Sequence, residues 1–126
     1  MGQPTVRVAD ETVPVHFLAP EHPVLNFPNK IGPADFDGWV QERGLYFWSQ
    51  FDARYQPILE MHDPGEAETN GSLVCARDGK GYYTYTGLSF FRQLPEGVPG
   101  ALRLFVNLLS QGRAATKAAA QSPAKR

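Results

Sequence analysis

The sequence predicts a domain of the α/β or α+β class, and three consecutive features of its last third carry that prediction. Asp78-Gly79 favours a tight hairpin turn, because this pair readily takes the positive φ angles that such turns require. Tyr82–Thr86 is aromatic and β-branched, as strands are, and Pro99–Ser110 repeats apolar residues at helical spacing. A hairpin, a strand and a closing amphipathic helix, in this order, are typical of the end of an α/β domain.

Length and composition fit one globular domain. The chain has 126 residues, of which 42% are hydrophobic and 12% aromatic, and single domains commonly contain about 100–150 residues. It has no apolar run of the ~18 residues that suggest a membrane-spanning helix, and its first residues form no apolar signal-peptide core. We therefore expect a folded body over residues 1–111, a disordered basic tail over residues 112–126, and no membrane partner.

Charge is distributed unevenly between body and tail. The body has thirteen acidic and eight basic residues, whereas the tail has four basic residues and no acidic one. An acidic body lacks the clustered lysine and arginine that neutralise phosphate groups, so the sequence argues against a nucleic-acid partner. The tail is expected to be solvated and disordered, and the alternative is weak contact with an anionic surface.

The first half of the chain predicts short elements separated by proline-rich loops. Thr5–Val8 and Val13–Leu18 have the composition of strands, and Pro14 places the second of them at a sheet edge because proline cannot donate to a ladder. Three prolines keep residues 19–29 extended.

A short helix is predicted over Ala34–Arg43, because Phe36, Trp39 and Val40 fall on one helical face and Gly44 is suited to end the helix. Four strands are then expected: Leu45–Trp48, Tyr55–Met61 (weakened by Pro57), Leu73–Ala76 and Tyr82–Thr86. The apolar stripe expected to be buried on the last helix consists of Leu102, Phe105, Val106 and Leu109.

The acidic loop after the second of these strands is one candidate for chemistry. His62-Asp63 with Glu66 places an imidazole and two carboxylates together, which suits a hard cation or acid–base work. The alternative is a solvated loop in which Asp63 caps a turn. None of the three histidines, His16, His22 and His62, has a partner at the spacing typical of helical metal sites. The sequence therefore predicts no metal-ligating residue in this chain.

His22 and Arg92 lie where ligand contacts are often placed. His22 is in a rigid loop between prolines, and Arg92 follows an expected strand end. Arg92 suits a carboxylate or phosphate group, and His22 suits either a ligand or a hydrogen bond to local backbone. The structural alternative for Arg92 is an ion pair with one of three carboxylates, Glu42, Glu66 or Glu96. The neighbouring pair Glu42-Arg43 has the same two interpretations, a ligand contact or a structural ion pair.

Nucleophilic catalysis has no support in the sequence. The single cysteine, Cys75, lies inside an apolar strand, where a thiol behaves as a small hydrophobic group. There is no Gly-x-Ser-x-Gly elbow. We therefore expect no catalytic residue.

Several blocks of the sequence are long and unusual. They are His22 to Leu25 with Pro28-Asn29, Asp35 to Phe47, Asp63 to Glu66, Gly79 to Pro95, Pro99 to Leu104 and Asn107 to Leu109. Through these blocks, residues Val6 to Ser110 resemble the C-terminal region of large bacterial proteins of the PIG-L (LmbE-like) deacetylase family.

The resemblance implies the kind of protein to which this chain would contribute, but no catalytic residue in the chain itself. In that family an N-terminal domain holds zinc through an Ala-His-Pro-Asp-Asp motif and a later histidine, and it removes the acetyl group from N-acetylglucosamine-type substrates. The C-terminal region is similar to a class I glutamine amidotransferase-like domain of the ThuA type. This chain has neither the zinc motif nor a cysteine elbow, and Phe90-Phe91-Arg92 stands where such enzymes place a His-x-Glu pair.

The resemblance thus implies the C-terminal part of a flavodoxin-like, glutamine amidotransferase-like α/β sheet with short helices and a β-hairpin edge. It also implies a non-catalytic accessory module whose partner is the deacetylase domain or its separate chain, with zinc only in that partner and no cofactor here. Two further hypotheses are a glycan- or small-ligand-binding module, with Trp39, Tyr46 and Trp48 in an aromatic rim, and a structural domain that self-associates. The residues expected to contact a ligand are His22, Trp39, Glu42, Arg43, Asp63, Glu66 and Arg92.

Overall fold

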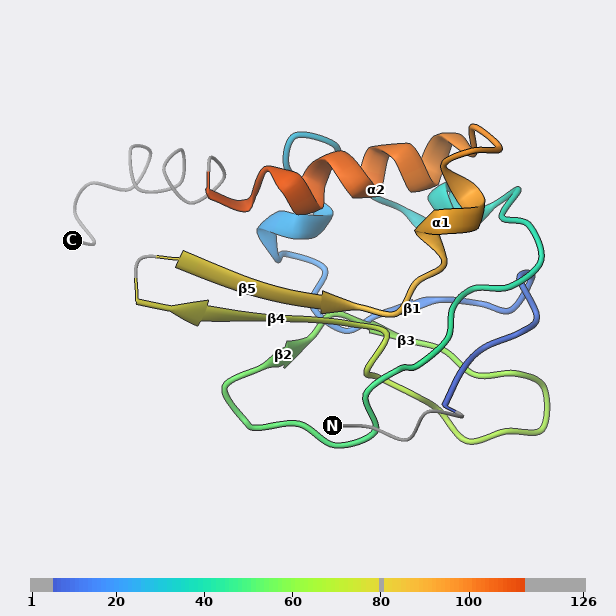
Figure 1. Ribbon diagram of the computed structural model, residues 1–126, viewed down its shortest axis with the longest axis horizontal. Coiled ribbons are helices and arrows are strands. Elements are labelled where there is room, and N and C mark those ends of the chain that lie inside the picture. Colours follow the sequence, from blue (N-terminus) through green and yellow to red (C-terminus); the bar gives the residue numbers. More distant parts are fainter. Residues whose placement is uncertain (1–5, 80, 113–126) are drawn as a thin grey trace.

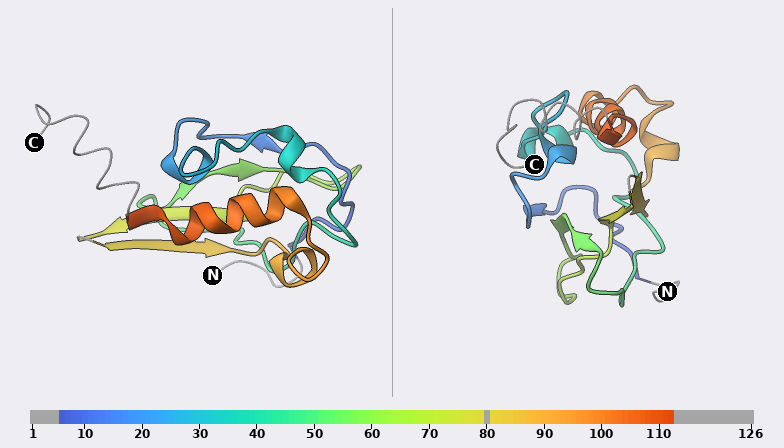
Figure 2. Two further views of the ribbon diagram at one scale, coloured as in Figure 1. Left: turned by 90° about the horizontal axis from the view of Figure 1, so that it is seen from above. Right: turned by 90° about the vertical axis from the view of Figure 1, so that its left-hand side faces the viewer.

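The computed structural model describes residues 6–79 and 81–112, which form two layers. The expected tail, from residue 113 on, lies outside these residues. Small antiparallel sheets make one layer, and all the helical elements cover one side of them (Figures 1 and 2). The strands are β1 (His16–Phe17), β2 (Gln56–Pro57), β3 (Leu59–Glu60), β4 (Leu73–Asp78) and β5 (Gly81–Thr86). The helical elements are the 3-10 turns η1 (Pro23–Leu25) and η2 (Pro33–Phe36) and the helices α1 (Phe90–Gln93) and α2 (Pro99–Leu109).

The strands pair in the orders β1-β3 and β2-β4-β5, and each of these pairs is antiparallel. Ile58 connects the two sheets, because its N–H donates to Leu73 of β4 while its carbonyl accepts from Leu18 beside β1. The mixed α/β class is thereby confirmed. A flavodoxin-like sheet is not confirmed, because that fold is built on parallel strands and the described strand pairs are antiparallel.

The β4–β5 hairpin is the longest ladder and confirms the strongest signal in the sequence. Gly79 has a φ of 60°, a left-handed conformation that favours glycine in a turn. Tyr83 and Tyr85 lie on one face, as predicted: Tyr83 packs edge-on against Tyr55, and Tyr85 stacks on Trp48 with 4.5 Å between ring centroids.

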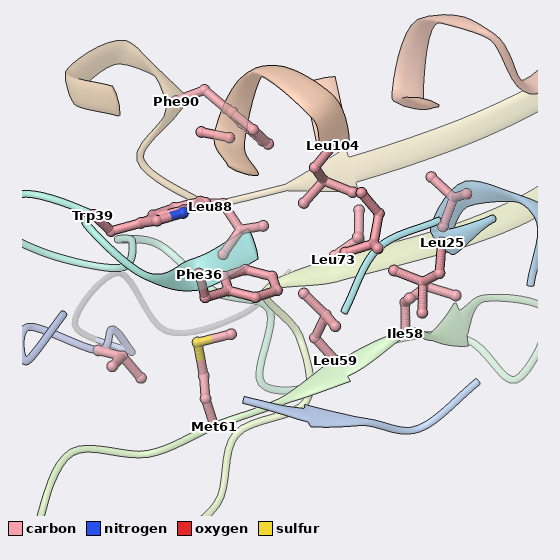
Figure 3. Close-up of a cluster of buried hydrophobic side chains, with 14 of the residues drawn as sticks. Leu25, Phe36, Trp39, Ile58, Leu59, Met61, Leu73, Leu88, Phe90 and Leu104 are labelled. Atoms are coloured by element: carbon pink, nitrogen blue, oxygen red, sulfur yellow. The ribbon is translucent and has the colours of Figure 1, made fainter. Parts of the chain in front are cut away.

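One hydrophobic core lies between the two layers. Figure 3 shows side chains from α1, α2, η1, η2 and the central strands converging there, among them Phe36, Leu59, Leu73 and Leu104. The helical layer is held by close backbone contact, since a Cβ added to Gly100 of α2 would lie 1.7 Å from the carbonyl oxygen of Asp35 in η2. Among the described residues, no helix has the length and apolar content needed to cross a membrane.

The helix predicted over Ala34–Arg43 is wrong, although Phe36 and Trp39 of its apolar stripe are buried and Val40 is half-buried. The helical turn ends after Phe36, because Asp37 is extended and Gly38 has a φ of 79°. Trp39 still reaches the core and donates from its indole Nε1 to the Asp35 carbonyl at 3.0 Å. Tertiary contacts thus bury this stripe without a continuous helix.

The predicted strands outside the hairpin are mostly shorter in the structure. Leu45–Trp48 is not a strand, and Tyr55–Met61 is divided into β2 and β3, with Pro57 in β2 unable to donate. Within the predicted strand Val13–Leu18, only β1 is a strand. Within Thr5–Val8, Thr5 lies outside the described residues, and Val8 forms an isolated bridge with Gly44.

Helix α2 is confirmed, but the predicted buried face is wrong. Leu102, Val106 and Leu109 are exposed, with Leu109 at 73%, and only Phe105 of the predicted stripe packs against the core. The residues that α2 buries are Gly100, Ala101, Leu104 and Asn107. The close approach of Gly100 to η2 turns the small residues inward, which leaves an apolar stripe on the outer face.

Candidate functional site

A hollow of about 260 Å³ lies where the C-terminal end of α2 and the η1 loop meet the sheet β2-β4-β5. Its lining comes from five separate segments of the chain: His22, Pro23, Arg54, Gln56, Cys75, Ala76, Arg77, Tyr82 and Gln111. Only His22 among these residues was predicted from the sequence to contact a ligand.

His22 is fixed by the turn that it begins. Its Nδ1 accepts a hydrogen bond from the backbone N–H of Val24 at 3.0 Å, so this nitrogen carries no proton. Burial lowers the pKa of His22 below its ordinary value, which keeps the ring neutral at pH 7. The proton of the neutral ring is therefore on Nε2, which is left as a hydrogen-bond donor. The hydrogen bond to local backbone that the sequence allowed is confirmed.

Asn107 attaches the η1 loop to α2. This residue is fully buried, and its amide nitrogen donates to the carbonyls of Val24 at 2.9 Å and Asn29 at 2.7 Å. Its Oδ1 accepts from the Asn29 backbone N–H at 3.0 Å. All polar atoms of the Asn107 side chain are thus paired, and the loop that presents His22 is held in one place.

The opposite side of the hollow is formed by the hairpin. Arg77 and Tyr82 are cross-strand partners, and the Arg77 guanidinium lies 5.6 Å from the centre of the Tyr82 ring. The Nε of Arg77 also donates to the Gly79 carbonyl at 3.1 Å, which holds the cation at this edge. Gln111 completes the lining by donating to the hydroxyl of Thr84, so the chain just after α2 is joined to β5.

The hollow combines an aromatic ring with several hydrogen-bonding groups. Besides Tyr82, it is lined by His22, by the amide residues Gln56 and Gln111, and by Arg54 and Arg77. Its volume is below the ~300–1,000 Å³ of sites for drug-sized ligands, so its size suits one small polar ring. A shallower depression that shares His22, Pro23 and Gln56 continues past Ala19–Glu21.

Cys75 lines the hollow without being a nucleophile. Burial raises the pKa of its thiol to about 11. The Thr84 hydroxyl, 3.7 Å away, is its hydrogen-bond partner. A neutral thiol is a poor nucleophile, because the thiolate is the reactive form.

We expect Cys75 to react with a thiol reagent at pH 8 at least about 100-fold more slowly in the native chain than in urea, since a pKa near 11 leaves about 100-fold less thiolate than one near 9. The measurement is the rate of colour release from an aromatic disulfide, with a short cysteine peptide as control. Equal rates for the native and unfolded chain would contradict a buried, protonated thiol.

The structure brings Glu42 and Arg92 together. Arg92 Nε donates to Glu42 Oε2 at 2.7 Å, so the structural alternative for Arg92 is confirmed, with Glu42 as its partner. Arg92 is in α1, a helical turn rather than a loop at a strand end, and its guanidinium lies 4.9 Å from the centre of the Phe91 ring. Arg92 and Phe91 line an open depression that shares no lining residue with the hollow at His22.

Trp39 and Arg43 are structural. Trp39 is buried, and Arg43 lies over its ring and that of Phe36, at 5.9 Å and 5.3 Å from the ring centres. Arg43 Nε donates to the Glu11 carbonyl at 2.8 Å, which ties the first residues of the body to η2. Burial lowers the pKa of the guanidinium, and nearby carboxylates, Asp10 first among them, oppose that effect.

Asp63 and Glu66 lie apart from the hollow. Asp63 accepts three hydrogen bonds from the backbone N–H groups of Ala9 and Asp10, at 2.8–3.0 Å, which fastens the loop to the N-terminal segment. Glu66 is exposed, and its backbone N–H donates to the Asp63 carbonyl at 3.0 Å. Of the expected aromatic rim, Tyr46 is exposed, whereas Trp48 packs on Tyr85.

Sequence reasoning missed Gln56, Arg77, Tyr82 and Gln111, which have no shared motif. The pairing of Arg77 with Tyr82 was not signalled either, because a two-residue loop at Asp78-Gly79 would pair Arg77 with Lys80, whereas the ladder pairs Asp78 with Gly81 and Arg77 with Tyr82. Nothing local indicates that Gln111 would lie against the same strand.

Comparison with protein-family models, with curated proteins and with solved structures found no match for this chain.

Proposed function

We propose that this chain is a non-catalytic binding module whose hollow beside His22 takes a small polar ring, of which a sugar of the N-acetylglucosamine type is the leading example. The observation that carries the proposal is the hollow itself, in which a neutral imidazole donor, two amide side chains and an arginine-supported tyrosine ring surround one volume. Aromatic faces and fixed hydrogen-bond donors are the groups that hold such a ring.

Among the described residues that line the hollow, no side chain is an activated nucleophile, which supports a binding role over a catalytic one. Cys75 is a protonated, buried thiol, and the arginines that the sequence singled out, Arg43 and Arg92, are engaged in packing and an ion pair. The side chains around the hollow can therefore orient a ligand, but none of them is arranged to attack it.

The resemblance to the C-terminal region of PIG-L (LmbE-like) proteins gives the proposed module a setting. In that setting the chain serves a zinc-dependent N-acetylglucosaminyl deacetylase domain, in the same protein or in a separate chain, and contributes no metal to its chemistry. The flavodoxin-like, amidotransferase-like sheet belongs to the same proposal, and its parallel strands would have to come from outside the described residues.

A second candidate is a structural domain that associates with a second copy of this chain. The outward face of α2 favours it, because Leu102, Val106 and Leu109 form an exposed stripe at helical spacing. Such a stripe on one helix can meet its copy about a twofold axis, burying both. This candidate predicts a molecular mass that rises with concentration and no bound sugar.

Calorimetric titration of the chain with N-acetylglucosamine, and with its 6-phosphate as an anionic probe, tests the first candidate. We expect saturable binding of at least one of them that Arg77→Ala weakens at least about tenfold, which is 1.4 kcal/mol. The matched control is Arg92→Ala, whose arginine is outside the hollow and is expected to leave affinity unchanged.

Two outcomes would overturn this proposal. Loss of binding in the Arg92 variant but not in the Arg77 variant would move the site to the Glu42–Arg92 pair. Absence of saturable binding by either sugar, with a mass that increases with concentration, would favour the self-associating domain.

A further inference from the structure

A group of two imidazoles and two carboxylates lies on the sheet β1-β3 and the chain that follows it. Two of these four residues, Glu60 and His62, belong to the segment 59–62. Leu59 and Met61 are fully buried in the core, so the residues that alternate with them, Glu60 and His62, face the other side of the strand. The sequence Leu-Glu-Met-His thus places a carboxylate and an imidazole on one surface.

Neighbouring segments contribute the other two residues, His16 and Glu68. His16 of β1 is the register partner of Glu60, and its Nδ1 lies 3.9 Å from a Glu60 carboxylate oxygen. On the other side, the bridge between Met61 and Thr69 continues the antiparallel pattern, so Glu68 lies opposite His62. Glu68 Oε2 is 3.5 Å from His62 Nε2 and 3.8 Å from His16 Nδ1.

We propose that His16, Glu60, His62 and Glu68 form a site for a divalent transition-metal ion of the zinc class. The ligand atoms of His16, Glu60 and Glu68 all lie within 4.8 Å of one another, and His62 adds a nitrogen beside Glu68. Bonds of ~2.0–2.2 Å to a tetrahedral zinc ion separate neighbouring ligand atoms by roughly 3.3–3.6 Å. The three imidazole–carboxylate separations, 3.5, 3.8 and 3.9 Å, need to shorten by at most a few tenths of an ångström, whereas the wider separation within the group, up to 4.8 Å, must close by more.

The hydrogen bond of His62 supports this assignment. Its Nδ1 lies 2.7 Å from the Asp63 carbonyl, and because a carbonyl only accepts, Nδ1 carries the proton. Nε2 is the ring nitrogen on the side of Glu68 Oε2, 3.5 Å away, where a metal ion would lie. A backbone carbonyl on the other ring nitrogen is the usual outer contact of a metal-bound histidine.

The two imidazoles and two carboxylates of this group favour a particular class of metal ion. Imidazole suits zinc, copper and nickel, whereas calcium and magnesium prefer sites made only of oxygen ligands. The cation that the sequence suggested for His62, Asp63 and Glu66 is different, because the Asp63 carboxylate is occupied by the backbone of Ala9 and Asp10. The partner of His62 is Glu68, eight residues beyond Glu60.

The test is titration of the full chain with zinc chloride at pH 7.5, followed by calorimetry, and with cobalt chloride, followed by visible absorption. We expect one equivalent of zinc to bind, and cobalt to give the intense d–d bands of a four-coordinate site. Glu68→Gln should weaken zinc binding at least about tenfold, since it removes the carboxylate that contacts both histidines. Calcium should not compete.

Two matched variants show whether zinc binds at these residues. Glu66→Gln removes an exposed carboxylate of the same loop and should bind zinc as the natural chain does, and His22→Ala tests whether the metal binds in the hollow instead. Thermal melts without metal confirm that each variant is folded. Failure to bind one equivalent of zinc, or equal affinity in the Glu66 and Glu68 variants, would overturn the site.

Discussion

The Asn107→Ala variant is expected to lose about 3–5 kcal/mol of unfolding free energy. Asn107 is fully buried, and its removal leaves the carbonyls of Val24 and Asn29 and the Asn29 N–H without their partner. Each unsatisfied buried group costs about 1–3 kcal/mol, partly recovered where water enters. The total is a large part of the ~5–15 kcal/mol that holds a typical domain together.

Urea denaturation followed by tryptophan fluorescence measures this loss. The control is Val106→Ala, which changes an exposed position of the same helix and is expected to stay within about 0.5 kcal/mol. Because Asn107 holds the loop that presents His22, the variant should also bind the sugar probe more weakly. An Asn107 variant as stable as the Val106 variant would show that the η1 loop is held by other contacts.

The second large effect is expected at Gly100. A methyl group there would lie 1.7 Å from the Asp35 carbonyl oxygen and 2.3 Å from its carbon, and both are backbone atoms that cannot rotate away. Alanine is favoured over glycine by up to about 1 kcal/mol inside a helix, so helix propensity alone predicts that Gly100→Ala stabilises the chain. We expect the opposite, a loss of about 3 kcal/mol or more as α2 is pushed from η2.

The sign of the change in unfolding free energy decides between helix propensity and backbone packing as the dominant effect at Gly100. The matched control is Gly32→Ala, at the start of η2, where an added methyl group meets no atom within 4 Å and φ is −130°. Chemical denaturation of both variants gives the comparison. A Gly100 variant more stable than the natural chain would mean that α2 and η2 are not packed backbone to backbone.

The elements that the sequence predicted well are those whose signals are local. The Asp78-Gly79 signal indicates the hairpin, although Asp78 ends β4 and pairs with Gly81, and Pro99 with a regular apolar period indicates α2. The segment Ala34–Arg43 was harder, because its stripe is buried by tertiary contacts even though Gly38 interrupts the helix. Burial alone did not require a helix there.

The buried face of α2 shows why large side chains can mislead. Leu102 and Leu109 suggested the inward face, yet the close contact at Gly100 and the hydrogen bonds of Asn107 turn a smaller, partly polar face inward. The candidate site could not be predicted from the sequence for a related reason. Tyr82 and Gln111 meet His22 only through long-range packing, and no spacing in the sequence connects them.

The most direct test of the proposed function is a two-dimensional NMR titration of the ¹⁵N-labelled chain with N-acetylglucosamine. We expect saturable shifts of amide signals around the hollow, at His22, Gln56, Arg77, Tyr82 and Gln111, with little change around the Glu42–Arg92 pair. Shifts centred on Glu42 and Arg92, or no saturable shifts at all, would contradict it.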